Sequence, residues 1–116
     1  MTSESAPQAP ELSVVVPVKD EAENVRPLID EITAALRGRV AFEIVYVDDG
    51  SGDATPAVLA TARAEVPELR VLRHEKNAGQ SAGVRSGVKA ARAPLVVTLD
   101  GDGQNEIAAA ATEGGA

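Results

Sequence analysis

The sequence predicts an α/β protein with a Rossmann-like open parallel sheet and helices on both faces. Short apolar runs rich in Val and Ile alternate with longer segments whose apolar residues recur at helical spacing. The short runs are almost continuously apolar, as strands buried on both faces require. The segments between them are long enough for the right-handed helical crossovers that join parallel strands.

The first half of the pattern is a strand over residues 12–18, a helix over 22–36 and a strand over 42–47. The helix is indicated by apolar residues that recur every three or four positions and share one face, namely Val25, Leu28, Ile29, Ile32 and Leu36. Gly38 provides a stop signal after this helix, and the run from Asp49 to Asp53 breaks the second strand.

The second half repeats the alternation. Thr55 is predicted to cap a helix that has Pro56 at its first position and runs to about Glu65. A strand over 69–72, a helix over 79–91 and a strand over 95–99 complete the order.

Three glycines, Gly79, Gly83 and Gly87, are spaced four residues apart in the third predicted helix and so lie on one face. Close packing against the sheet is the favoured explanation, with approach to a ligand as the alternative. Outside the α/β region, spanning residues 11–106, we expect a disordered lead-in over 1–10 and a low-complexity tail over 107–116.

Composition excludes several classes of function. The 116 residues contain no cysteine and one histidine, which excludes disulfide scaffolds and zinc sites built from those side chains. Aromatic residues are limited to Phe42 and Tyr46, and the net charge is −7, so neither a nucleic-acid partner nor electrostatic binding to anionic lipid is expected. No signal peptide or membrane-spanning run is recognisable, and a cytoplasmic location is the expectation.

Acidic residues gather where the predicted strands end. In an open parallel sheet ligands bind at this edge, and ten of the 18 acidic residues follow strands there. Such crowding is costly without a cation, and oxygen ligands suit Mg²⁺ or Mn²⁺, which could bridge the carboxylates to a diphosphate. Solvated acidic loops are the alternative.

The segment from Asp100 to Gln104 places oxygen-bearing side chains at alternate positions, separated by glycines that permit close backbone approach. An EF-hand is excluded because Asn105 and Ala111 occupy the positions that require Gly and Glu. A hairpin turn is the other alternative, but no apolar strand follows.

Two further strand ends carry candidate ligand contacts. Asp49, at the end of the second strand, could accept hydrogen bonds from a nucleobase, although a simple turn with a helix cap explains it equally well. The segment from Pro17 to Glu21 could cradle a base and ribose, although acids in a first helical turn also complement the helix dipole. Neither a P-loop nor a G-x-G-x-x-G motif is present.

Together these features resemble glycosyltransferase family 2 enzymes with the GT-A fold, and most of all their polyprenyl-phosphate branch of the dolichyl-phosphate mannosyltransferase type. The matching segments are VVVPVKDEAENV, EIVYVDDGSGDAT, LRHEKNAGQSAGVRSG and LVVTLDGDGQN, within residues 12–105. The resemblance implies the nucleotide-sugar-binding half of such an enzyme, with a GDP-mannose or UDP-sugar donor, inverting transfer and a polyprenyl-phosphate acceptor.

The resemblance also implies site residues. The nucleotide-sugar contacts would be Pro17, Lys19, Glu21, Val47, Asp49, Asp100, Gly101 and Asp102, and Mg²⁺ or Mn²⁺ would be held by Asp100, Asp102 and Gln104. No general base is identified, and an anionic phosphate acceptor needs little help from one.

The chain departs from the family pattern after Asn105, where Glu106 and Ile107 replace an expected Asp-Pro and the acceptor half is missing. A non-catalytic binding or interaction fragment is therefore the second hypothesis, with self-association through exposed sheet edges. A nucleotidyltransferase is the third, and it is disfavoured because no glycine-rich basic segment follows the first strand.

Overall fold

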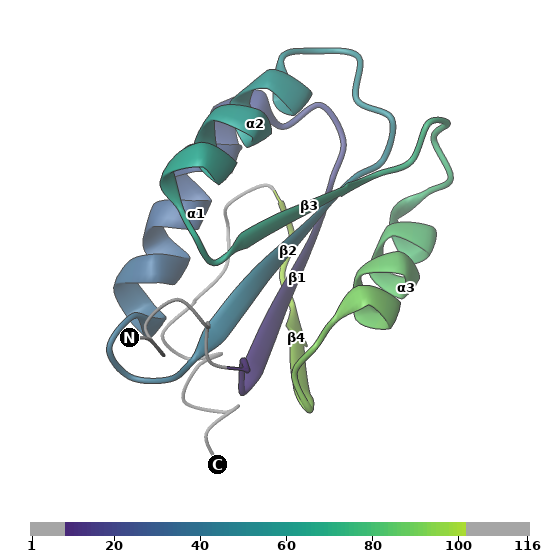
Figure 1. Cartoon of the computed structure of the whole chain (residues 1–116). Helices are drawn as coiled ribbons and strands as arrows, with labels where there is room; N and C mark the ends of the chain where they lie inside the picture. Colours follow the sequence, from purple (N-terminus) through teal and green to yellow (C-terminus); the bar gives the residue numbers. More distant parts are fainter. Residues whose placement is uncertain (1–8, 102–116) are drawn as a thin grey trace.

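The computed structural model describes residues 9–101 and confirms the predicted order of alternating strands and helices (Figure 1). Nearly all of the predicted lead-in and the whole predicted tail lie outside the described residues. The elements in chain order are β1 (Leu12–Val18), α1 (Ala22–Leu36), β2 (Phe42–Asp48), α2 (Thr55–Glu65), β3 (Leu69–Arg73), α3 (Gln80–Ala90) and β4 (Leu95–Thr98).

The strands form one sheet in the order β3-β2-β1-β4, and every neighbouring pair is parallel. The central strand β1 pairs with β2 along its whole length, but with β4 only from Leu12 to Val15. Because all four strands run the same way, the loops that follow them gather at one edge of the sheet.

Helices cover both faces of the sheet, as predicted: α1 and α2 lie on one face and α3 on the other (Figure 1). The larger core lies between the sheet and α1, where the apolar stripe predicted from helical spacing is buried, including Ile29 and Ile32 at 0% exposure. The core on the α3 side is smaller and is built on Val15, Val45 and Val47. The α3 helix itself contributes almost no side-chain bulk to it.

Glycines bring α3 close to the sheet. A Cβ atom on Gly87 would lie 2.3 Å from Cγ1 of Val15, and one on Gly83 would lie 3.0 Å from Cβ of Pro17. The prediction of close packing is therefore confirmed for these two positions. It is wrong for Gly79, which precedes the helix with a φ of 98° and would have no atom within 4 Å of its Cβ.

Several predicted boundaries shift by one residue: β2 and β3 each pair one residue further than the apolar run, whereas α3 is one residue shorter at each end and β4 one residue shorter at its end. The cap of α2 is also corrected: Ala54 is the N-cap residue, and Thr55 and Pro56 are the first two helical positions. Asp53 accepts a hydrogen bond from the Thr55 amide at 2.9 Å and so satisfies one of the free donors of the first turn.

Within residues 9–101, no helix combines the length and the apolar character that crossing a bilayer would require.

The Gly87 contact predicts that two glycine-to-alanine variants differ clearly in their free energy of unfolding. Gly87→Ala forces its methyl group into the stiff, fully buried Val15, at a cost that exceeds the helix-propensity gain of about 1 kcal/mol, so we expect a net loss of about 1–2 kcal/mol. Gly52→Ala is the matched control, because its Cβ meets nothing within 4 Å. Denaturant unfolding measures both, and equal stability of the two variants would contradict the packing argument.

Candidate functional site

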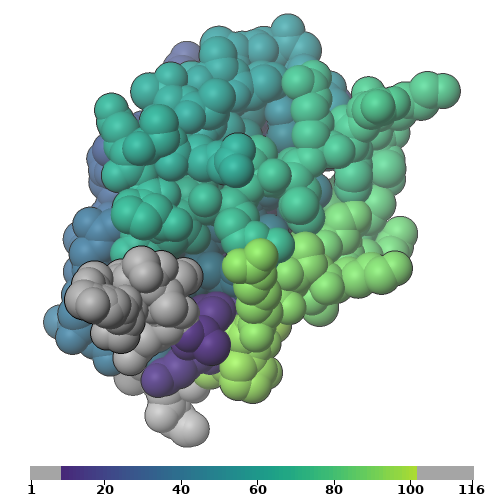
Figure 2. All heavy atoms as spheres, in the orientation of Figure 1, coloured from purple at the N-terminus to yellow at the C-terminus, as the bar shows by residue number. Residues whose placement is uncertain are grey.

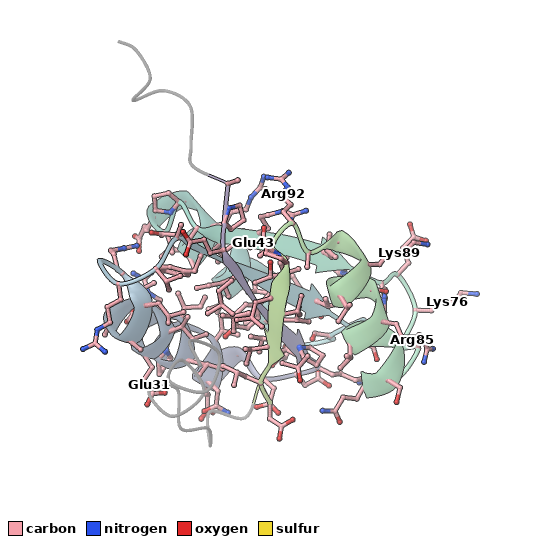
Figure 3. The ribbon with its side chains drawn as sticks, turned by 90° about the horizontal axis from the view of Figure 1, so that it is seen from below. Glu31, Glu43, Lys76, Arg85, Lys89 and Arg92 are labelled. Atoms are coloured by element: carbon pink, nitrogen blue, oxygen red, sulfur yellow. The ribbon has the colours of Figure 1, made fainter. Side chains whose placement is uncertain are left out.

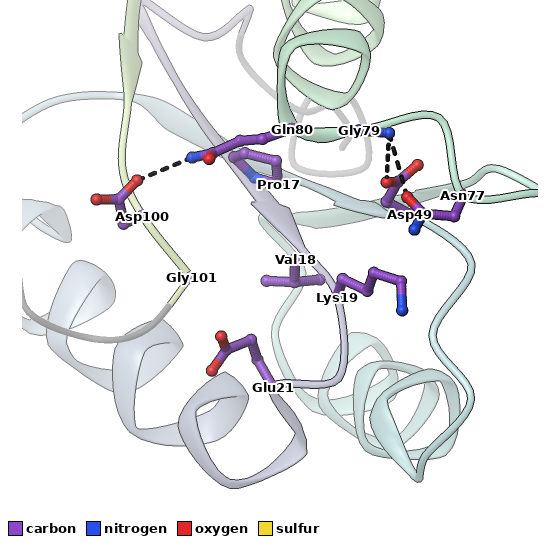
Figure 4. A pocket seen from close by; sticks show the side chains of 10 residues that line it. All are labelled: Pro17, Val18, Lys19, Glu21, Asp49, Asn77, Gly79, Gln80, Asp100 and Gly101. Atoms are coloured by element: carbon purple, nitrogen blue, oxygen red, sulfur yellow. Dashed lines mark hydrogen bonds between the residues drawn. The ribbon is translucent and has the colours of Figure 1, made fainter.

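A pocket of about 470 Å³ lies at the edge of the sheet where the strands end (Figure 4). It is lined by residues from the ends of β1, β2 and β4 and from the start of α3, namely Pro17, Val18, Lys19, Glu21, Asp49, Asn77, Gly79, Gln80, Asp100 and Gly101. Six of the residues expected to contact a nucleotide sugar are among them: Pro17, Lys19, Glu21, Asp49, Asp100 and Gly101.

The other expected residues lie elsewhere. Val47 is fully buried in β2 and does not line the pocket, and its side chain lies against Gly87. Asp102 and Gln104 lie outside the described residues.

The end of β4 shapes one wall of the pocket. The Leu99 amide still donates to the Val15 carbonyl at 3.0 Å, but no β4 residue pairs with β1 beyond Val15. Gly101 then packs directly on β1, since a Cβ there would lie 2.3 Å from Cγ1 of Val18 and 3.0 Å from the carbonyl oxygen of Pro17. The sequence predicted that this glycine approaches a ligand, whereas the close approach seen in the structure is to the protein's own strand.

The loops after β1 and β2 are joined by hydrogen bonds on the side away from α3. Asp20 has a φ of 55°, and its Oδ1 accepts the Gly52 amide at 2.8 Å while its own amide donates to Ser51 Oγ at 2.8 Å. The Glu21 amide donates to the buried hydroxyl of Thr55 at 3.0 Å. Glu21 takes part in this junction and Lys19 directly precedes it in the chain, so both residues are held at the pocket.

Asp49 holds the third loop against the end of β2. Its carboxylate accepts hydrogen bonds from the amides of Ala78 and Gly79 and from Nδ1 of His74, each at 2.8 Å, and its side chain is 5% exposed. Burial by itself raises the pKa of this carboxyl, but these three donors outweigh it and hold the pKa below its ordinary value of 3.8. The carboxylate therefore places the residues before α3 beside the pocket.

Sequence reasoning missed several residues at this loop. His74 links Asp49 to α3, since its Nε2 lies 2.8 Å from Oγ of Ser86. Gln80, the first residue of α3, donates from Nε2 to Oδ1 of Asp100 at 3.1 Å across the pocket (Figure 4). The sequence did contain a signal for them. They are polar residues between a strand and a glycine-rich helix, and such a position lies at the edge of a parallel sheet where ligands bind.

The acidic crowding has an explanation besides a bound cation. Asp20, Asp49 and Asp53 each accept at least one backbone N–H from a neighbouring loop or helix start. Within the described part of the chain, no three acidic or histidine side chains come together as a metal cluster. Asp100 and Glu21 bring carboxylate oxygens to the pocket, and these suit a hard divalent cation.

A second cavity, of about 570 Å³, lies at the opposite edge of the sheet. Its charged lining is largely paired: Glu43 accepts hydrogen bonds from Ser13 Oγ at 2.6 Å, the Arg92 amide at 2.7 Å and Arg70 at 2.8 Å. Burial by itself would raise the pKa of Glu43, but these donors outweigh burial and hold the pKa below its ordinary value. This network ties the beginnings of β1, β2 and β4 together, which is a structural role.

The Asp49 contacts predict a stability loss in Asp49→Asn. The amide keeps the shape but turns one acceptor into a donor that faces other donors, so we expect a loss of about 1–2 kcal/mol in unfolding free energy. Asp30→Asn is the control: its exposed pairing with Arg26 is worth less than about 0.5 kcal/mol. Equal losses in both variants would refute the role given to Asp49.

The same contacts predict a pH dependence. Because the pKa of Asp49 is lowered by folding, the stability it supplies is present above pH 3.8 and is lost as the pH falls through the folded-state pKa. The stability gap between the wild type and Asp49→Asn should therefore close on acidification below about pH 3.8. Thermal unfolding of both proteins across this range measures the gap, and a gap that persisted would contradict the prediction.

The sequence is similar to those of two transferases named for polyprenyl phosphates. The sequence is 40% identical over 104 residues to the dodecaprenyl-phosphate galacturonate synthase of Rhizobium johnstonii, covering 85% of this chain and 30% of that protein. It is 38% identical over 97 residues to the undecaprenyl-phosphate 4-deoxy-4-formamido-L-arabinose transferase of Yersinia pestis, covering 81% of this chain and 29% of that protein. The chain thus spans less than a third of the length of these relatives.

Solved structures share the fold. A mannosyltransferase from Pyrobaculum calidifontis, in complex with GDP-Man and Mn²⁺, superposes with a TM-score of 0.73 at 26% identity, over 82% of this chain and 28% of the other. S. aureus TarS in complex with UDP gives a TM-score of 0.71 at 27% identity, over 79% and 27%. These likenesses confirm the predicted GT-A class of fold.

The match to the family model covers residues 13–109, which include all of the sheet except Leu12 and every described residue of the pocket. On this evidence the chain belongs to glycosyl transferase family 2.

Proposed function

We propose that this chain is the donor-binding part of a glycosyltransferase that moves a sugar from a nucleoside-diphosphate sugar to a polyprenyl phosphate. The observation that carries the proposal is the pocket itself, which brings residues from the ends of β1, β2 and β4 into one cavity at the ligand edge of the sheet. The acceptor class is supported by the two relatives, one a dodecaprenyl-phosphate galacturonate synthase and the other an undecaprenyl-phosphate 4-deoxy-4-formamido-L-arabinose transferase.

Each side of the pocket has a proposed task. Pro17, Lys19 and Glu21 line the side for the base and ribose, with Lys19 as the one Lys or Arg among the described lining residues. Asp49 contacts the nucleoside, and its amide-anchored carboxylate keeps its position when the ligand leaves, whereas buried Val47 supports the strand behind it. Asp100 and Gly101, with Asp102, face the diphosphate.

We propose that Asp100, Asp102 and Gln104 hold Mg²⁺ or Mn²⁺. Their donors are all oxygens, as these cations prefer, and a structural neighbour contains GDP-Man with Mn²⁺. A metal there would act as a Lewis acid that stabilises the departing nucleoside diphosphate. The acceptor phosphate is already anionic at neutral pH, which is consistent with a donor half that supplies no general base, and we propose that transfer inverts the anomeric centre.

Calorimetric titration with GDP and with UDP, each with and without Mn²⁺, tests the proposal. We expect binding that requires Mn²⁺ and that weakens at least about ten-fold in Asp102→Asn, because one charged ligand oxygen is lost. Glu31→Gln, an exposed change on α1, is the control and should bind as the wild type does.

A melting curve recorded beforehand establishes that each protein is folded. A folded chain that binds neither nucleotide would overturn the donor-site proposal and favour the interaction fragment. Binding without catalytic turnover fits the proposal, because the chain covers less than a third of its relatives.

A further inference from the structure

Positive charge is concentrated in one part of this acidic chain. Residues 76–99 contain no Asp or Glu and four of the 11 Lys and Arg residues, namely Lys76, Arg85, Lys89 and Arg92. All 18 acidic residues and the seven other cations lie outside this segment. The net charge of −7 is therefore the sum of a positively charged segment and a negatively charged remainder.

The cations project from the side of the molecule that α3 forms. Gly83 and Gly87 turn toward the sheet, and the spacing of Arg85, Val88 and Lys89 places these residues on the opposite side of the helix. Figure 3 shows Lys76, Arg85 and Lys89 extending outward on this side, away from Glu31 on α1. In Figure 2 the green atoms of α3 form one flank of the molecule, separate from α1 and α2. We call Lys76, Arg85, Val88 and Lys89 the α3 face.

The α3 face has no internal charge partner within the part of the chain that the structure describes. Arg26, Arg37 and Arg70 form ion pairs with carboxylates, whereas none of the cations of the α3 face does so there. Val88, between Arg85 and Lys89, is 44% exposed. Cations that surround an exposed apolar side chain are the chemistry of a surface that meets an anionic, partly apolar partner.

We propose that the α3 face docks on an anionic lipid bilayer. Charge complementarity favours this occupant, and the proposed lipid-phosphate acceptor, on which this step of the argument rests, would be embedded in the same bilayer. Gly79, the N-cap residue of α3, and Gln80, its first residue, line the pocket, so docking would bring the pocket mouth to the level of the lipid headgroups.

The carboxylates of α1 do not cancel this attraction, although exposed Glu75, the sequence neighbour of Lys76, offsets part of its charge. The acidic residues exposed on α1 lie on the far side of the sheet (Figures 1 and 3), so the sheet and the roughly 10 Å width of α3 itself separate them from the α3 face. The Debye length at physiological salt is about 8 Å, so salt screens them from a surface in contact with α3. The expectation from net charge alone, that anionic lipid is disfavoured, overlooks this separation.

Vesicle co-sedimentation tests the proposal. We expect the chain to bind vesicles of equal parts phosphatidylcholine and phosphatidylglycerol, not vesicles of phosphatidylcholine alone, and to be released by high salt. Each cation near the surface contributes about five-fold to partitioning, so the double variant Arg85→Glu and Lys89→Glu should lose more than about twenty-fold.

The matched control reverses two exposed cations elsewhere that form no ion pair with any residue in the range 9–101. Arg39→Glu with Arg63→Glu gives the same net charge as the α3 variant but leaves the α3 face intact, and it should bind anionic vesicles nearly as the wild type does. Circular dichroism melting confirms that both variants fold. Equal losses in the two variants, or no binding of the wild type to anionic vesicles, would overturn the proposal.

Two further measurements separate this proposal from its alternatives. Sedimentation velocity without lipid tests whether the α3 face binds a second copy, and a wild-type oligomer that only the α3 variant dissolves, without vesicle binding, would overturn membrane docking. Nucleotide titration of the α3 variant should match the wild type, since none of the substituted residues lines the pocket. Failure of the donor-site proposal would appear in that titration, whereas failure of docking would appear only with vesicles.

Discussion

The pocket depends on one buried carboxylate. Asp49 follows β2 directly and accepts two backbone amides and an imidazole, all from the segment that leads from β3 to α3. Those bonds, together with the close approach of Gly50 to the backbone of Asn77, hold the segment before α3 against the end of β2. Because the donors lie 25 to 30 residues further along the chain, this single side chain joins two βα units that share no helix.

Glycine provides the second constraint, since two backbones approach β1 more closely than any side chain would allow. Gly87 lets α3 lie on Val15, and Gly101 lets the segment after β4 lie on Val18. The first contact covers the smaller core, and the second forms a wall of the pocket. The strand that is buried in the middle of the sheet is thus also the strand from which the site is built.

The charges of the chain serve different purposes in different places. At the pocket edge, Asp20, Asp49 and Asp53 satisfy loop and helix amides, which reduces the repulsion that their crowding suggests. At the opposite edge, Glu43 joins Arg70 and Ser13. On α3, the cations face outward without such partners among the described residues. A net charge describes none of these arrangements.

The fold class, the order of the elements and the edge of the sheet that carries the pocket could all be predicted from the amino-acid sequence. Apolar periodicity and the direction of parallel strands are properties of local pattern and topology, so Val25 to Leu36 on one helical face, or Asp49 and Asp100 at strand ends, could be read directly. The partner of each polar group, by contrast, depends on how the chain folds. Asp49 with Gly79, Asp20 with Gly52 and Gln80 with Asp100 are contacts between distant segments, and a residue's own neighbours in the sequence carry no record of them. The outward cations of α3 depend on the fold in the same way, because side chains from different segments form one surface only after the chain has folded.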